Sequence, residues 1–341
     1  MMEGPLAGVR VVELAGIGPG PFGAMVLADL GAEVVRIDRP GGHPAAWGRV
    51  KAFGRGKRTL EIDLKSAAGV AEVLELVAGS DALIEGYRPG TAERLGLGPA
   101  ECLARNPALV YGRMTGWGQE GPYSATAGHD INFLAVSGVL HAIGREGERP
   151  VPPLNLLGDF GGGGMLLALG LVAALFAARR DGRGQVVDAA ILDGTALLGT
   201  VIHDFLAEGG WADRAGVNLL DGGAPFYDTY TCADGLFVAV GALEPAFYAA
   251  LVERLGLQGE VAPAGRHLDP GNWPTIRARL TETFATRTRD EWAAFFADGD
   301  CCVSPVLSLR EAPADAHNRA RGVFRERDGR TEPAPAPRFS G

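Results

Sequence analysis

The sequence predicts an α/β protein with a large domain built on a parallel sheet and a smaller α/β domain. Two observations support this fold class. Short apolar strands and amphipathic helices alternate over the first half of the chain, and a hairpin pattern followed by helices begins a new unit near residue 222. At 341 residues the chain also exceeds the usual size of a single domain.

The first half reads as strand and helix in turn, the arrangement in which crossover helices connect parallel strands. The predicted helices cover residues 22–32 and 67–77. The predicted strands cover residues 9–14, 33–38, 59–64, 81–86 and 109–114.

The second half begins with an apolar helical pattern after Asp188, which suits a connection between two bodies. A hairpin turned at residues 233–235 follows. Two helix starts are then marked by Pro245 in a first helical position and by a capping box of Thr288 and Glu291. We therefore predict a large domain at 1–188, a helical linker at 189–221, a small domain at 222–310, and a linker and tail at 311–341.

The composition excludes several classes of protein. With 47% hydrophobic and 21% charged residues the chain can bury a sizeable core, and its net charge of −9 argues against nucleic acid as the main partner. The cysteines have no CxxC spacing, so we interpret them as structural thiols and expect neither a disulfide framework nor a metal site. They are Cys102, Cys232, Cys301 and Cys302.

Two apolar stretches could be mistaken for targeting or membrane segments. Residues 9–14 lack a basic leader, so we expect no signal peptide. Residues 160–178 are uncharged, but four glycines open them within a globular pattern, so we expect a buried helix and no membrane partner. Because the last residues, 339–341, are not a peroxisomal tripeptide, a cytoplasmic location is expected.

A literal GxGxxG pattern covers Gly18 to Gly23, with Asp38 twenty residues beyond the first glycine. The spacing matches the fingerprint of a dinucleotide-binding fold. However, a phosphate cradle needs backbone N–H donors, and Pro19 and Pro21 have none. We interpret the pattern as a tight turn from strand to helix, and an NAD-dependent dehydrogenase stays an alternative of lower rank.

Basic residues gather at residues 54–58 (GRGKR), and Arg39 directly follows Asp38. Three cations and two glycines in five residues suit a mobile loop that binds the phosphorylated end of a nucleotide. A solvated basic turn explains the same residues, and the sequence does not separate the two interpretations.

His129 lies in the sequence AGHDIN, directly before apolar residues at helical spacing. At a helix start the partial positive charge of the helix disfavours imidazolium and favours a neutral, basic ring. A histidine there is often only a hydrogen-bonded structural residue, so this position alone does not identify a proton carrier.

Asp159 shortly precedes four glycines, 161–164, and an uncharged helix, so it is predicted to be an ionised N-cap. Capping does not explain the glycines, each of which costs about 0.5–1 kcal/mol relative to alanine within a helix. Close approach of another group to the backbone explains them better. His129 and Asp159, each at a helix start, therefore form a candidate acid–base pair.

Several longer stretches, beginning with AGHDIN and PLNLLGDFGGG, resemble the α-methylacyl-CoA racemases of the family III CoA-transferase superfamily. The others are GRGQVVDA (182–189), NLLDGGAPFYDTY (218–230) and VAVGALEPAFY (238–248). The resemblance covers essentially the whole chain. It implies a Rossmann-like large domain joined by long linkers to a small α/β domain, with the tail returning to the large domain. It also implies an interlocked homodimer whose active sites lie between the large domain of one chain and the small domain of the other.

The resemblance also implies roles for individual residues. His129 and Asp159 match the catalytic pair, Glu244 a glutamate that orients the histidine, Arg94 an arginine near the site, and Asn155 a residue of the same catalytic loop. The segments implied to bind CoA or substrate are Arg39, Leu60, Glu61, Ile62, Asp63, Leu64, Tyr87, Arg88, Gly128 and Asp130.

The activity implied is interconversion of (2R)- and (2S)-2-methylacyl-CoA thioesters by proton transfer through an enolate, without metal or redox cofactor. The backbone N–H of Asp130 is the implied donor to the enolate oxygen. The acyl group stays open among branched fatty acyl, sterol side-chain and arylpropionyl thioesters. The main alternative is a CoA-transferase in which Asp159 forms an anhydride, and a non-enzymatic acyl-CoA carrier is a third hypothesis.

Overall fold

The computed structural model describes residues 4–42 and 50–340. Contacts divide these residues into two compact units. The first unit comprises residues 4–42, 50–140, 152–201 and 332–340, and the second comprises 141–151 and 202–331. Each unit has its own apolar core. The grouping of residues 141–151 with the second unit was not part of the predicted division, and the assignment of functions to the domains stays a prediction.

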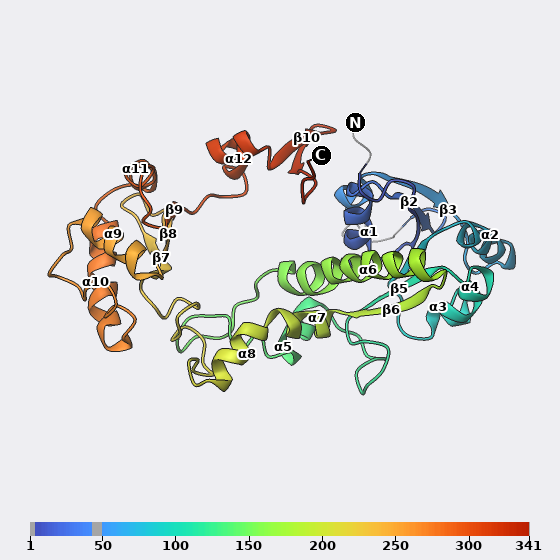
Figure 1. Ribbon diagram of the computed structural model, residues 1–341, viewed down its shortest axis with the longest axis horizontal. Helices are drawn as coiled ribbons and strands as arrows, with labels where there is room; N and C mark the ends of the chain where they lie inside the picture. The colour runs from blue at the N-terminus through green and yellow to red at the C-terminus, as the bar shows by residue number, and fades with distance from the viewer. Residues whose placement is uncertain (1–3, 43–49, 341) are drawn as a thin grey trace. The chain divides into compact units, whose positions relative to one another are not determined.

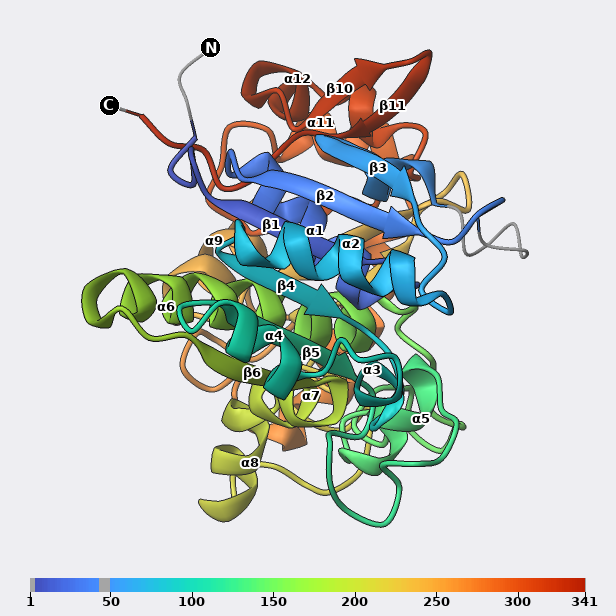
Figure 2. The same cartoon turned by 90° about the vertical axis from the view of Figure 1, so that its right-hand side faces the viewer.

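The first unit is built on a six-stranded parallel sheet with the strand order β3-β2-β1-β4-β5-β6. Figure 2 labels every strand of this sheet, and Figure 1 labels β2, β3, β5 and β6. The strand order reverses between β1 and β4, where ligands bind in open α/β sheets. The strands are β1 (Arg10–Leu14), β2 (Glu33–Asp38), β3 (Lys57–Glu61), β4 (Ala82–Glu85), β5 (Val110–Thr115) and β6 (Gln185–Ala190).

Helices cover both faces of this sheet, as the alternation of strands and helices predicts. Val11 and Ile84 face α1 (Pro19–Asp29) and α6 (Leu166–Asp181) in one apolar core, while Leu83 and Tyr111 face the other core. Figure 2 views the latter face, with α2 (Ala67–Ala78) and α4 (Pro99–Arg105) in front of the strands. The remaining helical segments of the first unit are η2 (Lys51–Gly54), α3 (Thr91–Arg94), α5 (Asp130–Val136), η3 (Leu156–Met165) and α7 (Ile191–Leu198).

Helix η3 continues directly into α6. Among the described residues this stretch, Leu156–Asp181, is the one helix long and apolar enough to cross a membrane by length and composition. Leu167, Leu171 and Leu175 recur at helical spacing and are buried in the core of the first unit, as predicted for a buried helix. Leu169 and Phe176 on the same helix are exposed, so the prediction holds for one face only.

The second unit carries a three-stranded antiparallel sheet in the order β7-β8-β9. The predicted hairpin turn and both predicted helix starts are confirmed: Glu244 is the N-cap of α9, and Thr288 with Glu291 forms the capping box of α11. Its strands are β7 (Tyr227–Thr231), β8 (Phe237–Gly241) and β9 (Val303–Pro305), and its helices are α9 (Pro245–Leu255), η4 (Pro270–Asn272), α10 (Trp273–Phe284), α11 (Arg289–Phe295), η5 (Ala312–Ala314) and α12 (Ala316–Arg321).

Two further segments have regular structure: α8 (Thr200–Ala207) follows α7, and β10 (Phe324–Arg327) pairs with β11 (Arg330–Pro333).

Three of the cysteines are buried, as structural thiols should be, whereas Cys302 is exposed and has a positive φ of 50°. The interpretation of the cysteines as structural thiols therefore does not extend to Cys302, because its turn after Cys301 places it at the surface of the second unit.

Candidate active site

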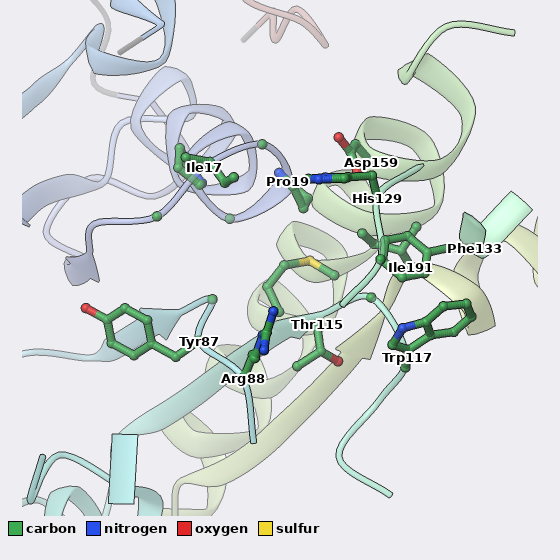
Figure 3. A pocket seen from close by; sticks show the side chains of 18 of the residues that line it. Ile17, Pro19, Tyr87, Arg88, Thr115, Trp117, His129, Phe133, Asp159 and Ile191 are labelled. Atoms are coloured by element: carbon green, nitrogen blue, oxygen red, sulfur yellow. The ribbon is translucent and has the colours of Figure 1, made fainter. Parts of the chain in front are cut away.

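A cavity of about 950 Å³ lies at the carboxyl edge of the sheet in the first unit (Figure 3). Its walls come from the chain segments that follow β1, β4 and β5, so it occupies the point where the strand order reverses. The segment after β1 is the GxGxxG stretch: Gly18 has a φ of 67°, and α1 begins at Pro19. The interpretation as a strand-to-helix turn is confirmed, and the turn also forms part of the cavity wall.

The candidate residues that line this cavity are fewer than those inferred from the sequence. They are Tyr87, Arg88, Gly128, His129, Asn155 and Asp159. The residues that line the cavity do not include Arg39, Arg94 or residues 60–64. Arg39 directly follows β2 and Glu61 ends β3, so both lie at the same edge of the sheet as the cavity. Their implied contacts with CoA stay predictions.

His129 is the N-cap of α5, as predicted from the spacing of the apolar residues that follow it. Its backbone N–H donates to Oδ1 of Asn132 at 3.0 Å, which fixes the turn that leads into the helix. The side chain is exposed and lines the cavity, so its imidazole is accessible to a ligand there.

Asp159 lies within the first turn of η3, and the N-cap of that helix is Asn155. The predicted N-cap role of Asp159 is wrong, because the helix begins at Leu156, three residues before Asp159. The carboxylate instead lines the cavity with His129 (Figure 3) and accepts a hydrogen bond of 3.2 Å from the Asn155 side-chain amide.

Burial raises the pKa of the Asp159 carboxyl above its ordinary value, and the nearby charge of Asp130 acts in the same direction. The amide of Asn155 and the charge of His129 oppose this rise because both stabilise the ionised form. A carboxyl with a raised pKa can hold a proton as an acid and still act as a base, which suits reversible proton transfer.

Asp130 connects the two helices that present these side chains. Its Oδ1 accepts a hydrogen bond of 2.7 Å from the backbone N–H of Asp159, so the carboxylate of α5 caps the start of η3. A Cβ at Gly158 would lie 2.3 Å from the same oxygen, which explains why a glycine is needed there. This role of the Asp130 carboxylate was not predicted from the sequence, where Asp130 was assigned to substrate binding and its backbone N–H to the enolate oxygen.

The glycine run of η3 permits close packing of helices. A Cβ at Gly162 would lie 2.7 Å from the backbone nitrogen of Thr195 on α7, and one at Gly164 would lie 2.7 Å from the Pro19 carbonyl of α1. The close approach of another group to this backbone, inferred from the four glycines, is confirmed. The described contacts identify α1 and α7 as the elements that do so.

The Tyr87–Arg88 segment is held by buried charges beneath it. Glu85, at the end of β4, accepts from the backbone N–H of Tyr87 at 2.7 Å and from Nε of Arg113 at 3.1 Å. Burial, aided by the charge of Glu85, raises the pKa of the Tyr87 hydroxyl to about 12, so this hydroxyl stays protonated at neutral pH. Glu85 and Arg113 were not identified from the sequence, where they resemble ordinary charges within apolar strands.

The basic run 54–58 does not form the mobile phosphate-binding loop, which was one of the two interpretations that the sequence left open. Arg55 is buried and pairs with Asp29, while the Lys57 ammonium is 2.5 Å from the buried carboxylate of Glu13. Two of its three cations are therefore neutralised inside the protein and cannot reach a phosphate. The burial of these two cations could not be inferred from the sequence, because their acidic partners come from distant positions of the chain.

The remaining candidate residue, Glu244, belongs to the second unit, where it is the N-cap of α9. Among the described residues no group of three or more His, Cys, Asp or Glu side chains is arranged to hold a metal ion.

The doubly wound sheet, with an imidazole and a carboxylate in one cavity at its carboxyl edge, defines an α/β protein equipped for acid–base chemistry. Residues 6–340 match CoA-transferase family III, and the chain belongs to this family.

Individual relatives narrow the comparison further. Over 97% of its length the chain is 50% identical to the α-methylacyl-CoA racemase of Mus musculus, and it is 48% identical to that of Homo sapiens, covering 85% and 86% of those proteins. A solved structure of a CAIB/BAIF family protein from Brucella suis matches with a TM-score of 0.83 at 28% identity, covering 99% of this chain and 93% of that one.

Proposed function

We propose that this protein is a racemase that interconverts (2R)- and (2S)-2-methylacyl-CoA thioesters by proton transfer at C2. One observation carries the proposal: His129 and Asp159 line the same cavity in a chain that is half identical to a relative named α-methylacyl-CoA racemase. Racemisation requires one group to remove the α-proton and a second group to return a proton to the opposite face of the planar intermediate. An imidazole and a carboxyl of raised pKa supply two such groups.

In one direction His129 takes the proton and the protonated Asp159 returns one, and in the other direction the roles reverse. The thioester carbonyl makes the α-proton removable only if fixed donors stabilise the enolate oxygen. The backbone N–H of Asp130 is the proposed donor. It lies in the first turn of α5, where N–H groups have no acceptor within their own helix.

The other roles are proposals on the family resemblance. Glu244 orients His129, Arg94 and Asn155 complete the catalytic set, and the CoA moiety is held by Arg39, residues 60–64 and the Tyr87–Arg88 segment. The Asn155 amide, which donates to Asp159, supports its inclusion. Since the reaction only moves protons between side chains and C2 of the substrate, we propose that it needs no metal or redox cofactor. We keep the cytoplasmic location as a proposal.

We also propose that the protein acts as a homodimer. Large apolar side chains are exposed on η3, α6, α7 and the start of α8, which is unusual for the surface of a monomeric protein. These side chains are Leu156, Met165, Leu169, Phe176, Leu197, Leu198 and Val201, each with at least 45% of its surface exposed.

The decisive experiment is incubation of a single enantiomer of a 2-methylacyl-CoA with the protein in deuterated water. Deuterium at C2 together with loss of optical purity is the expected result. His129→Ala and Asp159→Ala should each abolish racemisation in both directions while CoA affinity is kept, and unchanged turnover in either variant would refute the pairing.

A CoA-transferase is the second candidate, favoured by the family to which the chain belongs and by an Asp159 carboxylate that is accessible from the cavity. In that reaction the carboxylate attacks the thioester, CoA leaves as the thiolate, and an acyl-aspartyl anhydride forms. Acyl migration to an added carboxylate acceptor with retained configuration, or a trapped adduct on Asp159, would favour the transferase.

A further inference from the structure

The basic run 54–58 holds both ends of helix α1. Arg55 donates from Nε to the Asp29 carboxylate at 3.0 and 3.1 Å, at the last residue of α1, and from Nη1 to the Pro333 carbonyl at 2.8 Å. Lys57 donates from Nζ to the Pro21 carbonyl at 2.8 Å, in the first turn of the same helix. One short segment therefore fixes where α1 lies along its own axis.

The first turn of α1 is also a wall of the candidate active site. Gly18, Pro19 and Pro21 line the cavity. A Cβ at Gly18 would lie 3.4 Å from Oδ2 of Asp159, so this turn lies directly against the proposed proton carrier. A shift of α1 would therefore change the space and the solvent access around that carboxylate.

The contact that holds this turn depends on a buried ion pair. The side chains of Lys57 and Glu13 are 1% and 0% exposed, and their charged groups are 2.5 Å apart. Burial lowers the pKa of Lys57 and raises that of Glu13, and their mutual attraction opposes both changes. Apolar residues of similar volume are generally no less stable than such a pair, so its presence indicates a positional role.

We propose that Lys57 is a positioning residue for the acid–base site: held by Glu13, it fixes the first turn of α1 through the Pro21 carbonyl and so sets the wall that lies against Asp159. The expected effect on catalysis rests on the proposed racemase function. The contact between Lys57 and the Pro21 carbonyl does not depend on that function.

The test separates positioning from stability with the double variant Glu13→Leu/Lys57→Met. Changing Lys57 alone would leave the buried Glu13 carboxylate with only the Arg36 guanidinium, whose Nη1 is 3.5 Å from it, and would endanger folding. The double change removes both charges of the Lys57–Glu13 pair and fills the space with apolar groups. Arg36 keeps a partner in this variant, because its Nη2 is 3.2 Å from the Asp38 carboxylate. The matched control is Arg105→Met, which removes the cation of the exposed Arg105–Glu75 ion pair.

Two measurements are made on the full chain. Hydrogen–deuterium exchange of the peptide containing Gly20, Phe22 and Gly23 reports how often the first turn of α1 opens, and it needs no substrate. Steady-state racemisation of a 2-methylacyl-CoA reports the site. In the double variant we expect exchange about tenfold faster in that peptide and kcat about 10- to 100-fold lower, with KM within about twofold, since small displacements of reacting groups reduce turnover this strongly.

The control should match the native protein in both measurements. A double variant that folds and shows native exchange and native kcat would overturn the proposal. A double variant that fails to fold would overturn it as well, because the pair would then be structural. If the unmodified protein does not racemise the thioester, the proposed function fails, and the exchange measurement alone still decides whether Lys57 holds α1.

Discussion

The carboxylate of Asp130 accepts a hydrogen bond of 2.7 Å from the backbone N–H of Asp159. Asp130 directly follows His129, so this bond joins the residues that present the imidazole and the carboxylate to the cavity. Two groups that exchange protons with one carbon must keep a fixed separation, because a misplacement of about 1 Å can cost about 100-fold in rate. The Asp130 carboxylate is therefore the link on which the geometry of the pair depends.

Replacing Asp130 with alanine removes this link. We expect Asp130→Ala to lower kcat for racemisation about 100-fold in both directions, while Asp130→Asn, which keeps an oxygen acceptor in place, should stay within about tenfold of the native rate. Polarimetry of each enantiomer of the substrate measures both directions. An asparagine variant as inactive as the alanine variant would show that the charge of Asp130, and not its position, is what the site requires.

The pH dependence follows from the charges around Asp159. In the direction in which Asp159 takes the proton, it must be ionised, so the rate falls as the pH drops through its raised pKa. Asn155→Ala removes a donor to the ionised form and should move this acidic limb to higher pH. Asp130→Asn removes a neighbouring negative charge and should move the limb to lower pH.

The direction to measure is identified with His129→Ala, in which only the enantiomer deprotonated by Asp159 should still exchange its α-proton with solvent. Rate profiles of the two variants that move in the same direction would contradict this account of the Asp159 pKa.

Gly158 provides an independent test of the same link. Because a Cβ at this position would lie 2.3 Å from Oδ1 of Asp130, Gly158→Ala should displace that carboxylate, lower kcat about 100-fold and destabilise the protein by about 1–3 kcal/mol. Gly54→Ala is the control, since no atom lies within 4 Å of its added Cβ. Urea unfolding measures stability. A Gly158→Ala variant of native activity would mean that the Asp130 carboxylate has room to move without consequence.

The sheet could be predicted because its strands have local signatures. Buried apolar runs separated by helical segments identified β1, β2, β4 and β5 within one or two residues. The strand β6 was missed. Its sequence, QVVDAA, is short and follows a helix closely, and its extended form is fixed by pairing with β5, from Val110 opposite Gln185 to Thr115 opposite Ala190. Pairing with a partner 75 residues away leaves no local pattern.

Charged residues show more clearly that contacts between distant positions leave no local pattern in the sequence. His129 and Asp159 could be found because each lies at a helix start beside glycine. The buried pair of Lys57 and Glu13 could not, since a lysine between glycine and arginine looks solvated until a partner 44 residues away is placed beside it. The start of the strand β3 was placed too late for the same reason: it begins at Lys57, whereas the predicted strand begins two residues later. The link from Asp130 to Asp159 spans 29 residues and was hidden for the same reason.

The exposed apolar side chains of the first unit lead to a prediction about assembly. Leu169 and Phe176 are seven residues apart on α6, on one face of the helix, and are 65% and 72% exposed. If a second copy covers this face, charges placed there must be desolvated on assembly, at a cost of several kcal/mol for each unpaired ion. Leu169→Glu/Phe176→Glu should therefore halve the mass observed by analytical ultracentrifugation while the circular dichroism spectrum stays native. Leu309→Glu, at a position in the second unit that is 94% exposed, should leave the mass unchanged. An unmodified protein that sediments as a single chain at micromolar concentration would refute the proposed homodimer.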